Sequence, residues 1–153
     1  LDVETAFQHG ELDVEICMEP PEGIEDIMEL DRKEECMELL VCTYGLVQAS
    51  RKYRKKFVQV MKSHGVEEID ADPCLMIKLK EDKPILYVGT HVDDSMTIGK
   101  IEDINEMIKH MEKEGLTTKC EELKEYLGCN VVFSEDRKKA WLGQTETVKK
   151  LER

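Results

Sequence analysis

Three short apolar segments follow one another in the middle of the chain, and the connections between them are too short to hold a helix. Residues 74–80 and 84–91 are separated by three charged residues, which is typical of a hairpin. The apolar pattern resumes at 96–98, after an interruption that contains Asp93 and Asp94. Strands joined by such short connections pair antiparallel. The segment therefore predicts an antiparallel sheet with two adjacent carboxylates at a tight turn.

Two amphipathic helices are expected before and after this sheet segment. From Gln48 to His64 apolar side chains recur at intervals of three and four residues, and Gly65 ends the pattern. From Asp103 to Glu114 the same spacing indicates a helix that packs one face on a sheet. Strands and helices mix without regular βαβ alternation, so the expected fold class is α+β.

The other segments predict shorter elements. The expected elements are a strand end at 1–7, an exposed loop at 18–35, a buried strand at 37–44, a hairpin formed by 131–133 and 140–142, and the start of a helix at 146–153.

The composition is typical of a soluble globular protein. Hydrophobic residues make up 41% and charged residues 37% of 153 residues, which suits a single domain spanning 1–153. No apolar stretch is long enough to cross a membrane, so no membrane partner is expected. The six cysteines include no C-x-x-C pair, which favours free thiols inside the cell over a zinc site. Because the chain begins with Leu1 rather than Met, we expect a fragment of a longer reading frame.

The net charge of −12 opposes binding to a polyanion unless positive charge is concentrated locally. Five bases lie within six residues at the start of the expected helix 48–64, namely Arg51, Lys52, Arg54, Lys55 and Lys56. They are either a solvated helix face or a surface that contacts phosphates.

Asp2, Asp93 and Asp94 are the candidate metal ligands. Adjacent strands could bring Asp2 beside Asp93, and magnesium takes one or two carboxylates while leaving positions for water and phosphate oxygens. Two such ions can stabilise the attacking and the leaving oxygen of an in-line displacement at phosphorus. The alternative is ordinary turn chemistry, since 34 of 153 residues are acidic and aspartate is common in turns.

The order of segments resembles that of copia-type retrotransposon reverse transcriptases over nearly the whole chain. LDVETAFQHGEL resembles the first catalytic motif of that family, and HVDDSMTIG resembles its Tyr-Val-Asp-Asp motif. Five further stretches fall in the family order, namely MEPPEG, LLVCTYGLVQASRKYRKKF, DADPCLMIK, EYLGCNV and LGQTETVKKL. The chain departs from the pattern at His91, Val47, Ser50 and Gln8-His9, where the family usually has Tyr, Lys, Pro and Leu-Asn.

The resemblance implies a palm-like antiparallel sheet packed on helices, without most of the fingers and thumb. It makes Asp2, Asp93 and Asp94 the ligands of two Mg²⁺ or Mn²⁺ ions, with Asp94 weaker or indirect. It implies nucleotide binding by the Val3 backbone, Phe7, Gln48 and Arg51, with Phe7 screening the ribose 2′-hydroxyl unless it is a core residue. Lys52, Arg54, Lys55 and Lys56 would contact nucleic acid, and the partners would be an RNA or DNA template and primer with dNTPs.

Three functions remain open at this point. The first is RNA-directed DNA polymerisation, the second is metal-dependent cleavage of DNA or RNA, and the third is an inactive binding or scaffold module. Exposed strand edges could also be covered by a homodimer. The expected location is the cytoplasm or a retrotransposon particle, with the nucleus as a further possibility.

Overall fold

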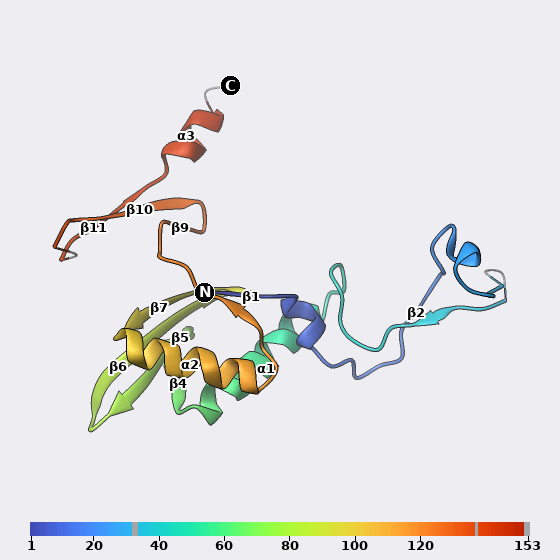
Figure 1. Cartoon of the computed structure of the whole chain (residues 1–153), viewed down its shortest axis with the longest axis horizontal. Coiled ribbons are helices and arrows are strands. Elements are labelled where there is room, and N and C mark those ends of the chain that lie inside the picture. Colours follow the sequence, from blue (N-terminus) through green and yellow to red (C-terminus); the bar gives the residue numbers. More distant parts are fainter. Residues whose placement is uncertain (32–33, 137, 152–153) are drawn as a thin grey trace.

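A six-stranded antiparallel sheet in the order β4-β5-β6-β7-β1-β8 is the largest element of the computed structural model, which describes residues 1–31, 34–136 and 138–151 (Figure 1). Its strands are β1 (Asp2–Val3), β4 (Val66–Ile69), β5 (Asp72–Lys80), β6 (Lys83–His91), β7 (Asp94–Gly99) and β8 (Thr118–Lys119). The predicted succession of antiparallel strands between residues 74 and 98 is confirmed.

Tight turns connect the central strands. Glu81 and Asp82, between β5 and β6, both have positive φ, at 52° and 58°. Two consecutive residues with positive φ form a type I′ turn, whose twist matches the twist of the two strands that it connects. The turn pairs Lys80 with Lys83, and an irregularity between Lys78 and Leu79 then shifts the register so that Met76 faces Val88.

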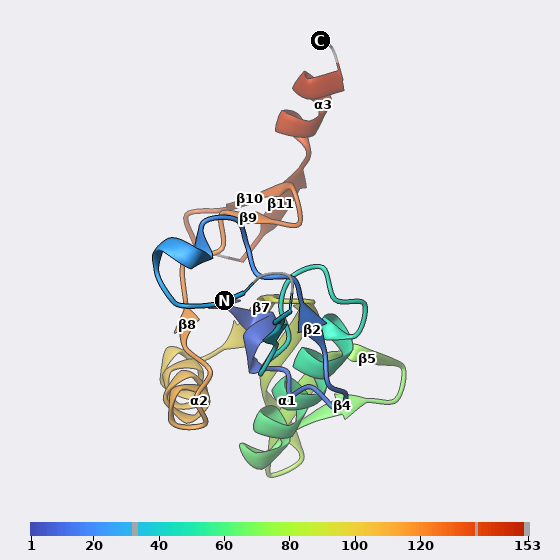
Figure 2. The ribbon, with the colours of Figure 1, turned by 90° about the vertical axis from the view of Figure 1, so that its right-hand side faces the viewer.

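Two helices cover one face of the main sheet. Helix α1 (Ala49–Ser63) and helix α2 (Ile101–Lys113) lie beneath it in Figure 2, as their apolar spacing predicted. The core cluster contains Tyr53, Phe57, Val60, Met61, Met107 and Met111 from the helices, and Val3, Met76, Leu86 and Val88 from the strands. Because side chains alternate along a strand, the neighbours of these strand residues point to the opposite, open face.

A smaller three-stranded sheet lies on the other side of the main sheet from the helices (Figures 1 and 2). It consists of β9 (Glu125–Tyr126), β10 (Cys129–Phe133) and β11 (Ala140–Gly143), and α3 (Thr145–Leu151) follows it. The predicted hairpin is therefore confirmed. The helix expected at 146–153 is observed through Leu151, and its last two positions lie outside the described residues.

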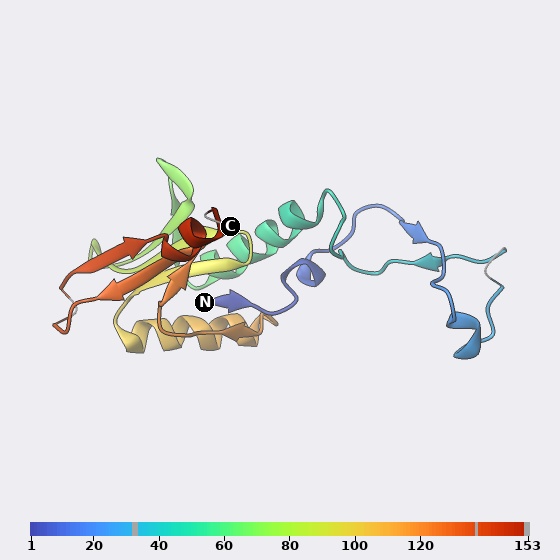
Figure 3. The same cartoon turned by 90° about the horizontal axis from the view of Figure 1, so that it is seen from above.

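An arm projects from the sheet along the long axis of the molecule (Figures 1 and 3). It follows the short 3-10 helix η1 (Ala6–His9) and contains the ribbon formed by β2 (Cys17–Met18) and β3 (Met37–Glu38), with η2 (Ile24–Asp26) between the two strands. The buried strand predicted at 37–44 is wrong. The strand pairing of β3 stops after Glu38, only an isolated bridge from Val41 to Glu11 follows among the described residues, and Leu40 is 81% exposed.

The fold class is α+β with antiparallel sheets, as predicted. Among the described residues, no helix is both long and apolar enough to cross a bilayer. The core that unites α1, α2 and the sheet positions the two segments that carry the candidate carboxylates.

Two histidines that are distant in sequence stack at the end of the helix pair. The rings of His64 and His110 have centroids 4.9 Å apart, and Lys78 Nζ donates to His64 Nε2 at 3.0 Å. Burial, followed by the charges of Lys78 and His110, lowers the pKa of His64, while Glu106 acts in the opposite direction. The folded chain therefore binds this proton less readily than the unfolded chain does.

We expect mild acid to destabilise the fold through His64. Above the ordinary histidine pKa, His64 does not change the free energy of unfolding with pH. As the pH falls below about 6.5, stability is lost because the unfolded chain takes up the proton before the folded chain does. The His64→Gln variant should show a smaller fall in Tm between about pH 7 and about pH 5. Equal falls in the variant and the parent, measured by circular dichroism, would contradict this.

Candidate active site on the open face of the sheet

The first strand, which carries Asp2, is held between two neighbours although it lies at the start of the chain. The N-terminal nitrogen of Leu1 donates to the Ser95 carbonyl at 2.7 Å, and the Ser95 amide donates back to the Leu1 carbonyl at 2.8 Å. On its other side β1 pairs with β8. Val3 is 2% exposed and fixes the strand to the core.

Asp2 and Asp94 lie directly opposite each other in the β1–β7 pairing. Because Leu1 and Ser95 exchange both hydrogen bonds, the next pair is of the non-hydrogen-bonded kind, in which Cα atoms are about 4.5 Å apart. Side chains of opposed residues share a face. Since Val3 points into the core, Asp2 and Asp94 point to the open face, and both are exposed.

The row continues across the sheet on both sides of the carboxylates. His91 of β6 is the register partner of Asp94, and Lys119 of β8 is the partner of Asp2. Lys119 also forms an ion pair of 3.3 Å with Glu4. One imidazole and one ammonium group therefore flank the carboxylate pair.

Asp93 occupies the two-residue turn between β6 and β7, next to a strained residue. Val92 has a φ of 55°, a conformation that a β-branched side chain rarely adopts. Such strain concentrates at functional sites, where the surrounding structure enforces it. Here the paired strands β6 and β7 hold the turn, so Asp93 is presented at the end of the hairpin.

Replacing Val92 by glycine should raise the free energy of unfolding by about 1 kcal/mol, because glycine adopts positive φ without a steric penalty. Urea unfolding followed by fluorescence measures this change. Val132→Gly in β10 is the matched control, since Val132 is 59% exposed and has no positive φ. The control should lower stability, and the same sign in both variants would argue against strain at Val92.

Tyr53 of α1 lies beneath the carboxylates. Tyr53 is 1% exposed, and its hydroxyl has no hydrogen-bond partner within the described part of the chain. Burial raises the pKa of Tyr53, and the negative charges of Asp93 and Asp2 raise it further. Both carboxylates therefore lie within electrostatic range of one buried hydroxyl, which brings Asp2 and Asp93 to the same end of the sheet.

The carboxylates would suit a magnesium or manganese ion with open coordination positions better than a metal ion that is ligated entirely by protein side chains. Among the described residues, no group of three or more His, Cys, Asp or Glu side chains is arranged to hold a metal. Magnesium in phosphoryl-transfer sites needs only one or two carboxylates, with water and substrate phosphates as the other ligands. Asp2 and Asp94 on one face, with Asp93 at the adjoining turn, match that requirement.

The residues predicted to bind nucleotide are distributed around this end of the sheet. Val3 lies in the ladder between β7 and β8 with a buried side chain. Phe7 is half-buried against the core and makes an edge-on contact with Tyr44, with ring centroids 4.7 Å apart. Gln48 is the N-cap residue of α1, and Arg51 is exposed in its first turn.

The basic cluster is divided between internal ion pairs and open surface. Lys52 forms an ion pair with Asp13. Arg54 Nη2 donates to Glu68 at 2.8 Å and to the Pro73 carbonyl at 2.7 Å, which ties α1 to β4 and β5. Lys55 is exposed and Lys56 is half-buried. Lys52 and Arg54 therefore have structural partners in addition to any predicted contact with nucleic acid.

Two neighbours of the carboxylates were missed by reasoning from the sequence. Lys119 follows the predicted second helix in a stretch without clear periodicity, and only the pairing of β8 places it beside Asp2. Tyr126 of β9 feels the charge of Asp94, which adds to burial in raising the pKa of that tyrosine. The only signal in the sequence was that Tyr126 belongs to the family-like stretch EYLGCNV.

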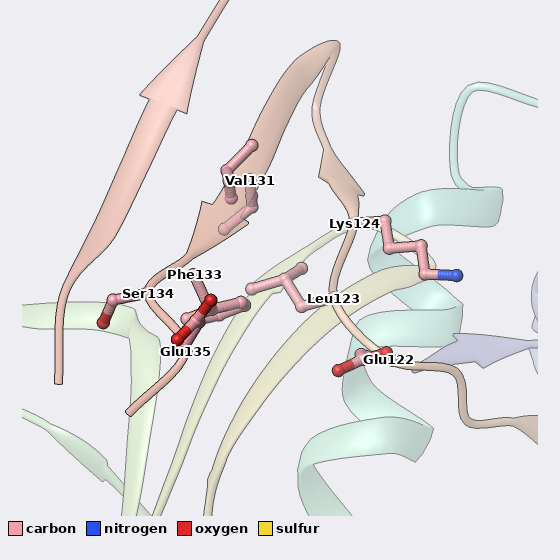
Figure 4. Close-up of a pocket in the computed structure, with 8 residues that line it drawn as sticks. Glu122, Leu123, Lys124, Val131, Phe133, Ser134 and Glu135 are labelled. Atoms are coloured by element: carbon pink, nitrogen blue, oxygen red, sulfur yellow. The ribbon is translucent and has the colours of Figure 1, made fainter. Parts of the chain in front are cut away.

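A shallow hollow of about 360 Å³ lies at the small sheet rather than at the carboxylates. Figure 4 shows Leu123 and Phe133 close together within it. Its lining comes entirely from 122–124 and 131–135. This hollow therefore contributes no ligand to the Asp2–Asp94 pair.

The comparisons with known proteins decide the family. Residues 1–150 match the family described as reverse transcriptase (RNA-dependent DNA polymerase). This chain belongs to the reverse transcriptase family. It is also 33% identical over 157 aligned positions to the retrovirus-related Pol polyprotein from transposon TNT 1-94 of Nicotiana tabacum. The resemblance to copia-type reverse transcriptases that the sequence predicted is thus confirmed.

The aligned region covers 99% of this reverse transcriptase chain but 11% of the tobacco polyprotein. The chain therefore spans about a tenth of the length of that relative. No solved structure matches it.

Proposed function

We propose that Asp2, Asp93 and Asp94 bind two divalent ions, Mg²⁺ or Mn²⁺, and that the chain is the palm of an RNA-directed DNA polymerase. The observation that carries this proposal is the register that puts Asp2 opposite Asp94 on the open face, with Asp93 at the adjoining turn. Like charges directly opposite in a sheet are unfavourable. Bound cations would remove this repulsion, so the arrangement becomes favourable when metal ions are bound.

In the proposed reaction the oxygen of a primer 3′-hydroxyl bonds to the α-phosphorus of a dNTP, and the bond to pyrophosphate breaks. The two ions, when bound, would stabilise charge on the attacking and leaving oxygens. Asp2 and Asp93 would hold them, and Asp94 would assist from the first position of β7. The rigid pairing of β6, β7 and β1 keeps these groups in place, which favours an in-line approach.

Charged groups around the carboxylates would orient the substrates. Lys119, opposite Asp2, offers an ammonium group to phosphate oxygens. Arg51 and Lys55 are exposed on α1 and would contact the backbone of the template or primer. Phe7 would lie against the sugar of the incoming nucleotide, where its ring disfavours a 2′-hydroxyl, although its contact with Tyr44 also serves the core.

Metal-dependent cleavage of nucleic acid is the second candidate. The same carboxylates could direct water instead of a primer hydroxyl to phosphorus, and one strand would then suffice as substrate. The observation that favours it is the use of Lys52 and Arg54 in internal ion pairs, which leaves less cationic surface for a primer and template.

A single assay separates these functions. The chain is incubated with an end-labelled primer annealed to an RNA or a DNA template, with Mg²⁺ or Mn²⁺, in the presence and absence of dNTPs. Products longer than the primer that require dNTPs support the polymerase, and shorter products that do not require them support the nuclease. Unchanged primer together with undiminished nucleic-acid binding would favour the inactive module.

A further inference from the structure

The arm carries two cysteines on one face of its ribbon. In the β2–β3 pairing Cys17 faces Glu38 and Met18 faces Met37, and the Leu39 amide donates to the Ile16 carbonyl at 2.8 Å. Cys36 lies two residues before Glu38 along the chain, so it shares the face of Glu38 and Cys17. The two thiols are therefore diagonal neighbours on this face, and both are exposed.

The two thiols are close enough to influence each other's ionisation. Interaction with the Cys36 thiol is the largest cause that raises the pKa of Cys17, to about 11. Partial desolvation and the charges of Glu15 and Glu38 act in the same direction. Glu15 also accepts a long hydrogen bond of 4.0 Å from the Cys17 thiol. Acidic surroundings disfavour formation of a thiolate, so Cys17 reacts slowly. Once Cys17 has reacted, Cys36 is already nearby as the second thiol.

The ribbon must shift to adopt the geometry of a disulfide. Diagonal neighbours on one face of a strand pair lie about 7–8 Å apart, whereas a disulfide needs Cβ atoms about 4 Å apart. The paired part of the ribbon is only two residues long in each strand and projects away from the core (Figures 1 and 3). A small shift between β2 and β3 therefore disturbs no core side chain.

We propose that Cys17 and Cys36 form a reversible disulfide that closes the arm, by exchange with a low-molecular-weight disulfide of the glutathione class. One protein thiolate attacks the small disulfide and releases one small thiolate. The second protein thiolate then attacks the protein sulfur of the mixed disulfide and releases the other. The two cysteines lose two electrons and two protons, and the small disulfide becomes two thiols. The proposal is independent of the carboxylate site.

Closure would restrain the segment between the two cysteines. It joins the ends of a stretch that contains Pro20, Pro21 and Gly23, and whose described residues form the short helix η2 (Ile24–Asp26). A covalent link across its base reduces the conformations open to this segment. The arm would thus be stiffer under oxidising conditions, while the main sheet and helices keep their structure.

The test is oxidation of the intact chain in glutathione buffers of increasing disulfide content, followed by acid quenching, alkylation and non-reducing peptide mapping. The expected main product joins the Cys17 and Cys36 peptides and has lost two hydrogen atoms. It should exceed glutathione adducts at Cys74 and Cys120, two other exposed cysteines, by about tenfold, because the second thiol acts at an effective concentration near millimolar. A dithiol reductant should restore both thiols. Equal adducts at all exposed cysteines would overturn the proposal.

Unfolding supplies a control that tests the ribbon itself. In urea the short loop between Cys36 and Cys42 closes more easily than the longer loop to Cys17. Cys42 is fully buried in the folded chain, so this alternative link should appear only after unfolding. Cys17→Ser and Cys36→Ser should each abolish the link, and Cys74→Ser should leave it unchanged. A Cys17–Cys36 link that is equally abundant in urea would show that the ribbon does not direct it.

Discussion

Replacing Asp93 by alanine should lower the proposed metal-dependent nucleotidyl transfer by about a thousandfold, because the loss of a proposed metal ligand would remove several kcal/mol of transition-state stabilisation. Asp93 lies in a turn that strands β6 and β7 hold. Together with burial, its negative charge and that of Asp2 raise the pKa of the Tyr53 hydroxyl. The change should leave the fold intact, since it removes a negative charge from a crowded acidic end of the sheet. Primer extension or strand cleavage, whichever the parent chain shows, measures the activity.

Direct metal binding provides a readout that does not depend on activity. Titration with Mn²⁺ followed by calorimetry should show weaker binding for Asp93→Ala and for Asp2→Ala than for the parent. Asp70→Ala is the matched control, because Asp70 is an exposed aspartate in the turn between β4 and β5. Asp70→Ala should keep both binding and activity. Undiminished Mn²⁺ affinity in both Asp93→Ala and Asp2→Ala would refute the assignment of these carboxylates.

Truncating Leu86 to alanine should cost about 2–5 kcal/mol of unfolding free energy, because a buried leucine leaves a cavity that the core fills only partly. Leu86 is 0% exposed and lies in the central strand β6, opposite Gly99. A Cβ added at Gly99 would lie 2.8 Å from Leu86 Cδ1, so the leucine already fills the space above that glycine. A domain is typically stable by only about 5–15 kcal/mol, so the loss is a large share of the total.

Leu79 offers a matched control in the neighbouring strand. It is 52% exposed in β5, so Leu79→Ala removes the same atoms mostly from water and should cost less than about 1 kcal/mol. Urea unfolding of both variants, monitored by circular dichroism, gives the comparison. Similar midpoints for the two variants would mean that the helices do not seal this face of the sheet as described.

Much of the fold could be predicted because its signals are local. The spacing of Tyr53, Phe57 and Val60 set the buried face of α1, and the charged turn at Glu81 and Asp82 announced the β5–β6 hairpin. The strand predicted at 37–44 was wrong because apolar character alone does not make a strand. A strand also needs a neighbouring segment whose backbone groups form hydrogen bonds with it. In the folded chain that partner, β2, begins only at Cys17, which lies opposite Glu38, so the strand pairing does not continue beyond Glu38.

The candidate site could be predicted in its members but not in its geometry. Asp93 and Asp94 stand at a turn that the sequence marks clearly, and the family resemblance added Asp2. The register that puts Asp94 rather than Asp93 opposite Asp2 depends on hydrogen bonds between Leu1 and Ser95, which are 94 residues apart. Lys119 joins the same row through another long-range pairing.

By itself the sequence determined the family, the antiparallel order of the central strands and the two helices that cover them, because hydrophobic spacing and turn chemistry act between near neighbours. Only the tertiary structure decided which residues flank the carboxylates, which of the clustered bases are engaged in ion pairs, and that Cys17 and Cys36 share one face of the ribbon. Those outcomes depend on strand register and on packing between distant segments. A shift of one residue in register would move every side chain of a strand to the other face.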